Sequence, residues 1–316
     1  MRNLTHKDVA VCICTYKNRY DMMLKHINDF KPFNVYVVCR RNDFIESGYD
    51  KYEWDDNVHV ILLDNVKNLN ETREAARIEL TKLGYKAAIM LDDDIHGDFA
   101  MKISPESKRE TSESYRAFQV PFMELLEKLL NTANEYDASF CSAAWPLYIG
   151  FGTPGAVAVN SGLIFGGVVF INLEDLAKHN LKYETDLHVI EDVDIVFQLL
   201  RVGCTCTTLG DYSYRMIPYS AETSVVGDEN WIKVATFLKW KNYYGLNTQF
   251  RKRYNNYVLQ ARPNTRKLFK NPDEYFKNDA YTRGLYDLCK EQYYGERDIT
   301  KVIDYINENK NKKGKQ

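Results

Sequence analysis

The 316-residue sequence lacks the marks of a membrane-spanning or disulfide-built protein. No apolar run approaches the roughly 20 residues that a transmembrane helix needs. The first ten residues, MRNLTHKDVA, do not lead into the apolar segment of a signal peptide. The seven cysteines are odd in number and form no CxxC pair, which argues against a disulfide framework and a simple zinc site. We therefore expect a cytoplasmic globular protein whose cysteines are reduced and mostly buried.

Acidic residues are missing from one long stretch of the chain. Residues 231–272 contain ten Lys and Arg and no Asp or Glu. The net charge of −2 therefore hides an asymmetry, because the first 230 residues sum to −12 and residues 231–316 sum to +10. We predict a first domain over residues 1–230 and a basic, mainly helical extension over 231–316, and the charge suggests an anionic partner for the extension.

The first half of the sequence alternates short apolar runs with amphipathic helices. The predicted strands are Val9–Thr15, Val35–Cys39, Val58–Leu63 and Ala87–Leu91, and a helix is predicted at Asn70–Leu83. This order predicts an α/β fold with a mostly parallel sheet covered by helices. Ligands bind at the carboxyl ends of such strands, so Thr15–Arg19 and Asp92–Asp94 should meet in one cleft.

Asp92, Asp93 and Asp94 directly follow the predicted strand Ala87–Leu91. Three adjacent carboxylates repel one another, and a divalent cation relieves that repulsion. Mg²⁺ and Mn²⁺ accept one or two carboxylates and fill their other positions with water and phosphate oxygens. Residues i and i+2 of a strand point the same way, so Asp92 and Asp94 are predicted to share one metal ion. The alternative is a solvated acidic turn or a helix cap.

Glu191 and Asp192 begin a predicted helix that Gly203 ends. Acidic residues in the first turn of a helix are favoured by its dipole, and this alone explains most such pairs. A carboxylate aimed into the cleft could instead take a proton from an acceptor hydroxyl group. The catalytic interpretation of this pair depends on its position in the chain. The pair follows Asp92–Asp94 and the predicted strand that begins with Gly166-Gly167.

This order resembles that of the GT-A glycosyltransferases of the large family-two-like group, over about residues 8–225. The resemblance implies a nucleotide-sugar donor, such as a UDP-sugar, and Mn²⁺ or Mg²⁺. It places the donor against Thr15, Tyr16, Arg19, Arg73, Asp92, Asp93, Gly166 and Gly167. It makes Asp192, with Glu191, the catalytic pair. A Q-x-x-R-W motif after this pair is lacking, which argues against a processive synthase, and a single base favours inversion of the anomeric centre.

The basic stretch interleaves its ten cations with nine aromatic residues over 231–272. Cations attract phosphates without regard to sequence, and aromatic faces accept unstacked bases. The densest patches hold the candidate nucleic-acid contacts Arg251, Lys252, Arg253, Arg262, Arg266 and Lys267. The same stretch would also suit a solvated pair of amphipathic helices or a surface that binds anionic lipid.

The composition rich in Asn, Lys and Tyr and the strand that runs into Asp92-Asp93-Asp94-Ile95 also resemble the phage-type TET-associated glycosyltransferases, which modify hydroxymethylated pyrimidines in DNA. This implies transfer of glucose, arabinose or another sugar to a base such as 5-hydroxymethylcytosine, in the host cytoplasm if a phage encodes the protein. Three alternatives remain: a glycosyltransferase of cell-surface polysaccharide or lipid synthesis, a catalytically inactive DNA-binding protein, and a sugar-1-phosphate nucleotidyltransferase. Against the last, Cys14–Arg19 contains none of the glycines that its opening motif requires.

Overall fold

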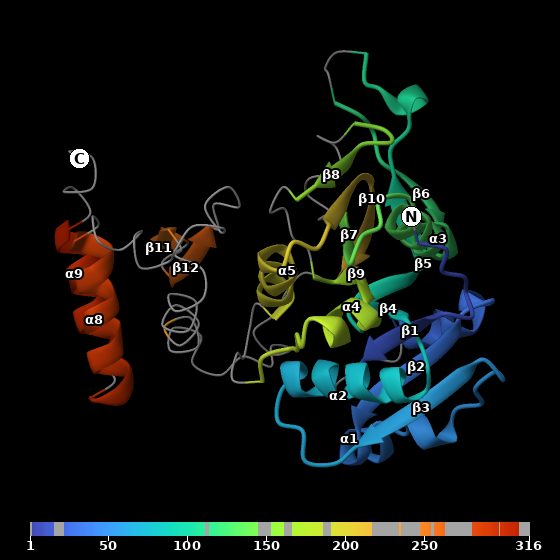
Figure 1. Ribbon diagram of the computed structural model, residues 1–316, viewed down its shortest axis with the longest axis horizontal. Coiled ribbons are helices and arrows are strands. Elements are labelled where there is room, and N and C mark those ends of the chain that lie inside the picture. Colours follow the sequence, from blue (N-terminus) through green and yellow to red (C-terminus); the bar gives the residue numbers. More distant parts are fainter. Residues whose placement is uncertain are drawn as a thin grey trace. The chain divides into compact units, whose positions relative to one another are not determined.

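The computed structural model divides the chain into two compact units (Figure 1). The first comprises Met1–Thr185 and Glu191–Ser220, and the second comprises Asp186–Ile190 and Ala221–Gln316. Residue 230, where the sequence predicts the domain boundary, lies outside the described residues. The structure describes residues 2–15, 22–110, 114–144, 153–160, 166–185, 191–216, 234, 247–253, 256–262, 280–296 and 298–309.

A ten-stranded sheet forms the centre of the first unit, in the order β3-β2-β1-β4-β9-β7-β10-β5-β6, with β8 paired to β10. Its strands are β1 (Val9–Cys14), β2 (Asn34–Arg40), β3 (Val58–Leu63), β4 (Ala87–Asp92), β5 (Ile95–Lys102), β6 (Phe118–Pro121), β7 (Phe140–Ala144), β8 (Val157–Val159), β9 (Val168–Asn172) and β10 (Cys206–Met216). Strands β3, β2, β1 and β4 are parallel, as the sequence predicts. Beyond β4 the sheet is mixed, because β9 runs antiparallel to both β4 and β7.

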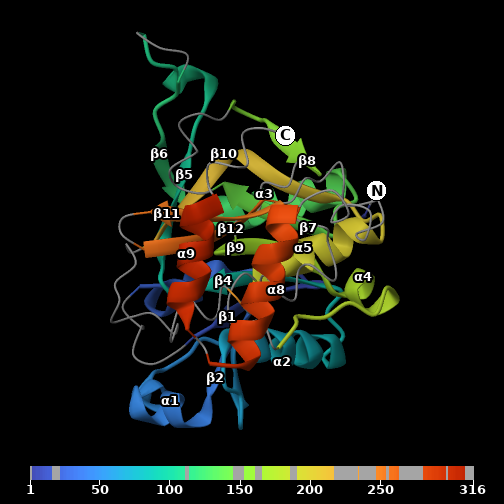
Figure 2. The ribbon, with the colours of Figure 1, turned by 90° about the vertical axis from the view of Figure 1, so that its left-hand side faces the viewer.

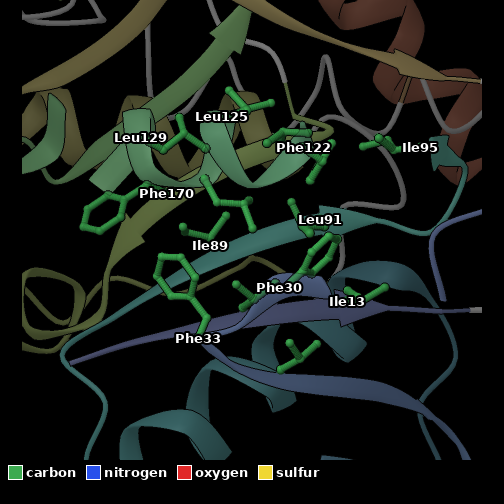
Figure 3. Close-up of a cluster of buried hydrophobic side chains, with 14 of the residues drawn as sticks. Ile13, Phe30, Phe33, Ile89, Leu91, Ile95, Phe122, Leu125, Leu129 and Phe170 are labelled. Carbon is green, nitrogen blue, oxygen red and sulfur yellow. The ribbon is translucent and has the colours of Figure 1, made fainter. Parts of the chain in front are cut away.

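The main apolar core lies on one face of this sheet. The helices of the unit are α1 (Arg41–Glu46), α2 (Leu69–Lys82), α3 (Phe122–Glu135), α4 (Leu173–Lys178) and α5 (Glu191–Arg201), with short 3-10 helices at Leu24–Phe30, Tyr49–Lys51 and Pro105–Ser107. Figure 3 shows Leu125 and Leu129 of α3 beside Ile89 and Leu91 of β4, and all four are at most 2% exposed. Truncating such a side chain to alanine costs about 2–5 kcal/mol. The core therefore holds the end of β4 firmly in place.

Helix α2 contacts β1, β2 and β3. Cys12 and Cys14 alternate with Ile13 along β1, so they occupy the sheet face opposite to the one that carries Ile13. Both thiols are buried, and all seven cysteines are free. This arrangement agrees with the prediction that the cysteines are mostly buried.

The second unit contains a two-stranded ribbon and a helix pair. The ribbon consists of β11 (Asn247–Arg253) and β12 (Asn256–Arg262), and the helices are α8 (Ala280–Tyr294) and α9 (Ile299–Asn309). Figure 2 shows α8 and α9 side by side, and Leu285, Cys289 and Val302 share a small core with Val234. The ribbon stands where the sequence suggests helices, because Phe250, Tyr257 and Leu259 alternate with polar residues at the strand period of two. Within the described part of the chain, no helix combines the length and apolar character needed to cross a bilayer.

Candidate active site

Arg73 is the centre of a polar cluster at the carboxyl end of β4. Helix α2 begins after Asn68, whose side chain caps it by accepting a hydrogen bond from the Glu71 backbone N–H at 2.9 Å. From that start, Arg73, Ala76 and Leu80 follow at helical spacing and are all buried. Arg73 thus occupies a position of the buried stripe that would ordinarily be apolar.

The Arg73 guanidinium joins two carboxylates from separate elements. Its Nη2 donates to Oδ1 of Asp92 at 2.5 Å, and its Nη1 donates to Oε1 of Glu191. The Arg73 side chain is only 3% exposed. A buried guanidinium is stable only with such partners. Arg73 therefore ties α2, β4 and α5 together.

The acidic trio does not continue as a strand. Strand β4 ends at Asp92, and Asp93 and Asp94 form the turn into β5. The Thr15 hydroxyl donates to Oδ2 of Asp93 at 2.9 Å, and both residues are buried. Of the predicted meeting between Thr15–Arg19 and Asp92–Asp94, the described residues show this contact of Thr15 with Asp93. The alternation predicted to align Asp92 with Asp94 stops at Asp92.

Several charges act on Asp92. Burial raises the pKa of its carboxyl group to about 7, the Arg73 guanidinium opposes that rise, and Asp94, Glu191 and Asp93 add to it. The crowding of negative charge is a property of the sequence Asp92-Asp93-Asp94 itself. A carboxylate cluster of this kind favours the approach of a cation.

Gly166 and Gly167 allow two side chains to approach the backbone closely. The Asp92 backbone N–H donates to the Gly167 carbonyl at 2.9 Å, which extends the pairing of β4 with β9. A Cβ atom at Gly166 would overlap the Asp192 carboxylate, and one at Gly167 would lie 2.8 Å from Cε2 of Tyr214. Only glycine fits at these two positions without displacing a neighbour. Asp92, the glycine pair and Asp192 therefore form one continuous group.

Asp192 sits in the first turn of α5 and is half-buried. Burial raises the pKa of its carboxyl group to about 6, the negative charge of Glu191 adds to the rise, and the Arg73 guanidinium opposes it. A carboxylate with a pKa near the working pH is suited to accept a proton. Because Arg73 engages Glu191, the two acidic residues that the sequence pairs have different surroundings, and Asp192 is the one beside Gly166.

Replacing Gly166 with alanine is expected to displace the Asp192 carboxylate. A misplacement of about 1 Å can cost a catalytic step 10²-fold, so we expect kcat to fall by about that factor. Steady-state kinetics on the purified variant measures this. Gly210→Ala is the matched control, because its new Cβ would crowd Ala156 at 3.0 Å from the backbone oxygen. An equal loss of kcat in both variants would show general overpacking and contradict the prediction.

Two tyrosines belong to the site, and the sequence does not predict either of them. Burial raises the pKa of the Tyr214 hydroxyl, with the negative charges of Asp92 and Asp192 adding to the rise. Tyr183 is buried, and burial raises the pKa of its hydroxyl while Arg73 opposes the rise. The only sequence signal for Tyr214 is its place in the alternating segment Cys206–Met216, which does not distinguish a core tyrosine from a site tyrosine.

The start of α2 also holds the chain that leads toward α5. The Glu74 carboxylate accepts from the Tyr183 backbone N–H at 3.0 Å, and the Asn70 amide donates to the Glu184 carbonyl at 3.0 Å. The Asn68 amide donates to the Thr185 carbonyl at 3.3 Å. One helix end therefore positions both the buried guanidinium and residues 183–185.

Eight other predicted site residues lie outside the described residues or in the second unit. Tyr16, Arg19, Arg266 and Lys267 lie outside the described residues. Arg251, Lys252, Arg253 and Arg262 belong to the ribbon of the second unit. The cluster itself unites Thr15, Arg73, Asp92, Asp93, Gly166, Gly167, Glu191 and Asp192.

The side-chain atoms of this cluster that are suited to bind a metal ion are carboxylate oxygens. Over the ranges that the structure describes, no three His, Cys, Asp or Glu side chains gather as a complete metal cluster. Oxygen ligands suit Mg²⁺ and Mn²⁺, which bind proteins through as few as one or two carboxylates and complete their shells with phosphate and water. The residues present fit a metal held jointly with a diphosphate.

A protein-family model described as TET-Associated Glycosyltransferase matches residues 9–217 of the chain. The match covers β1 to β10 and every member of the cluster around Arg73. No curated protein matches the chain.

Solved structures share the fold at low sequence identity. The crystal structure of S. aureus TarS 1–349 in complex with UDP-GlcNAc matches with a TM-score of 0.52 and 13% identity, over 90% of this chain and 80% of that one. GalNAc-T7 with UDP, GalNAc and Mn²⁺ matches with a TM-score of 0.50 and 11% identity, over 75% of this chain and 50% of that one. The protein also matches another crystal structure of S. aureus TarS 1–349, with 14% identity and a TM-score of 0.43. This match covers 66% of the present chain but only 59% of the TarS chain. The first two matches confirm the predicted α/β fold of GT-A type.

Proposed function

Because the chain belongs to the TET-associated glycosyltransferase family, we propose that it moves a sugar from a UDP-sugar to the hydroxyl group of a hydroxymethylated pyrimidine in DNA. The family match confirms the prediction of a glycosyltransferase and leaves donor and acceptor to be argued. The observation that carries the proposal is the contact between Gly166 and Asp192 next to the end of β4. It puts a proton-accepting carboxylate beside the acidic edge at which α/β sheets bind ligands.

The donor is proposed to be a nucleotide sugar on the strength of the fold and the acidic edge. TarS was crystallised with UDP-GlcNAc, and GalNAc-T7 with UDP, GalNAc and Mn²⁺. Thr15, Tyr16, Arg19 and Asp93 would hold the nucleoside side of the donor, and Gly166 and Gly167 would border its sugar. Arg73 supports this arrangement by fixing Asp92 and Glu191.

Asp92 and Asp94 would hold Mn²⁺ or Mg²⁺ together with the donor diphosphate. When bound, such an ion neutralises the charge that develops on the leaving diphosphate. Asp192 takes the proton of the acceptor hydroxyl group, whose oxygen then bonds to the anomeric carbon as the bond to the diphosphate breaks. One displacement with one base inverts the anomeric centre.

The acceptor is proposed from the family and from charge. A family associated with TET proteins is suited to oxidised methylpyrimidines, whose hydroxymethyl group supplies the hydroxyl. Residues 231–272 contain ten Lys and Arg and no Asp or Glu. This positive charge favours binding to the phosphates of DNA. We therefore keep the division into a catalytic domain at 1–230 and an acceptor-binding extension at 231–316 as part of the proposal.

The proposal is tested by incubating the full chain with a panel of nucleotide sugars and duplex DNA that contains 5-hydroxymethylcytosine. Digestion to nucleosides and mass analysis should reveal one added hexose or pentose with one donor, and none when EDTA replaces Mn²⁺. Cytosine and 5-methylcytosine duplexes are the controls, since neither offers the hydroxyl group. Transfer to a polysaccharide or lipid acceptor with no transfer to any DNA would contradict the proposal and support the alternative of cell-surface synthesis.

A further inference from the structure

The register of the β11–β12 ribbon sorts its residues onto two chemically different faces. The strands are antiparallel, with Asn247 opposite Arg262 and Arg253 opposite Asn256. Residues directly opposite each other share a face, and residues two apart on one strand share it as well. One face therefore carries Asn247, Gln249, Arg251, Arg253, Asn256, Val258, Gln260 and Arg262. The other carries Thr248, Phe250, Lys252, Tyr257, Leu259 and Ala261.

The first set, here called the arginine face, has an unusual composition. Seven of its eight residues are Arg, Asn or Gln, and neither strand contains an acidic residue. Sequence alone groups Lys252 with Arg251 and Arg253, but the register places it on the other face, paired with Tyr257. An isolated two-stranded ribbon is marginally stable in water, so the apolar face is the one suited to burial against protein. The arginine face is then suited to a polar, anionic partner.

Arginine, asparagine and glutamine are the side chains that read base edges. Arginine pairs with guanine through two hydrogen bonds, and asparagine and glutamine pair with adenine in the same way. The major groove of B-form DNA, about 12 Å wide, accepts a two-stranded ribbon. Residues two apart on a strand lie about 6.8 Å apart, which matches two base-pair steps of about 3.4 Å. The distance between Arg251 and Arg253 along the strand therefore matches two base-pair steps of the duplex.

We propose that the arginine face of the β11–β12 ribbon binds double-stranded DNA in its major groove. The inference deepens the proposed function, on which it rests for the identity of the acceptor, by assigning the surface that holds the duplex. A surface rich in lysine would bind anionic lipid as well as it binds DNA. A face of Arg, Asn and Gln instead supplies directional hydrogen bonds, which binding to a lipid surface does not need. The deep and narrow major groove of A-form RNA does not admit the ribbon.

The experiment compares charge-matched variants of the full chain. Binding to an unmodified 30-bp DNA duplex is measured by fluorescence anisotropy at 50–200 mM salt for wild type, R251Q/R253Q and K252Q. In the groove the two guanidinium charges would also lie among the flanking phosphates, and each neutralised phosphate contributes about 0.9 to the salt slope, so R251Q/R253Q should lower the slope by nearly 2. Over this salt range the wild type should lose about tenfold more affinity than the double variant. K252Q should retain the wild-type slope, although it removes an adjacent charge of the same sign.

Further arms separate the alternatives. Arg262→Gln, on the other strand of the same face, should lower the slope by about 1, and circular dichroism checks that each variant is folded. Equal effects of K252Q and of Arg262→Gln would overturn the assignment to one face. So would tighter binding to anionic vesicles or to duplex RNA than to DNA. The duplex carries no hydroxymethyl group, so this binding test does not depend on sugar transfer. Binding with the expected face preference would support the proposal even if no sugar transfer is found. Sugar transfer that is unaffected in R251Q/R253Q would overturn the role of the ribbon and leave the proposed function in place.

Discussion

Asp192→Asn is expected to lower kcat by about 10²–10⁴-fold, the usual contribution of a general base. The substitution keeps the shape of the side chain beside Gly166 and removes its ability to accept a proton. Donor affinity, measured by calorimetry, should remain close to that of the wild type, because the proposed donor contacts lie elsewhere in the cluster. Single-turnover transfer to the acceptor measures the loss.

The pH profile gives the same prediction a second test. The base acts as a carboxylate, so kcat/KM of the wild type should fall as the pH drops through about 6, the raised pKa of Asp192. Below that point the fall should be about tenfold per pH unit. Asp194→Asn is the control, since Asp194 already accepts from Gln198 at 2.7 Å on the same helix. If transfer by Asp192→Asn persists with an unchanged acid limb, then another residue is the base.

Arg73→Met is expected to destabilise the first unit strongly. It leaves the carboxylates of Asp92 and Glu191 without their shared cation, and breaking a buried ion pair in this way costs about 3–5 kcal/mol. Arg73→Lys should recover part of the loss, because a lysine cannot present two forked donors to two carboxylates. The free energy of unfolding in urea measures both effects. A stability of Arg73→Met equal to that of the wild type would refute the role given to the guanidinium.

The pH dependence of this variant follows from the direction of the pKa shifts. Without Arg73, the pKa of the Asp92 carboxyl group should rise further, since the guanidinium opposes the rise that burial causes. A group whose pKa is raised on folding stabilises the protein at low pH, and that stability is lost as the pH rises through the folded value. The deficit of Arg73→Met should therefore be small near pH 5 and largest near pH 8. Combining it with Asp92→Asn and Glu191→Gln should restore much of the stability.

The sequence predicts the parallel part of the sheet well, because β1 to β4 are short apolar runs with clear ends. It also predicts that Thr15 and the acidic trio meet, since both follow adjacent strands. It does not predict the partners of Arg73, because a 118-residue separation from Glu191 leaves no local pattern. The antiparallel course of β9 is equally hidden, since an apolar run looks the same in either direction.

The ribbon shows a different limit. Lysine, arginine and tyrosine suit an amphipathic helix and a strand alike, and the local period over residues 247–262 is the only feature that separates them. Once the register is known, one run of three cations divides between two faces. The number of charges in a stretch of sequence is therefore larger than the number that one binding partner can contact on a single face.

The shared guanidinium of Arg73 also limits how this protein can change over time. One cation serves two acids that arrive from distant parts of the chain, so none of the three can be exchanged alone at small cost. Related sequences that have lost the arginine should have lost the negative charge at one or both of the other positions in the same lineage. The three residues would then be inherited as a set.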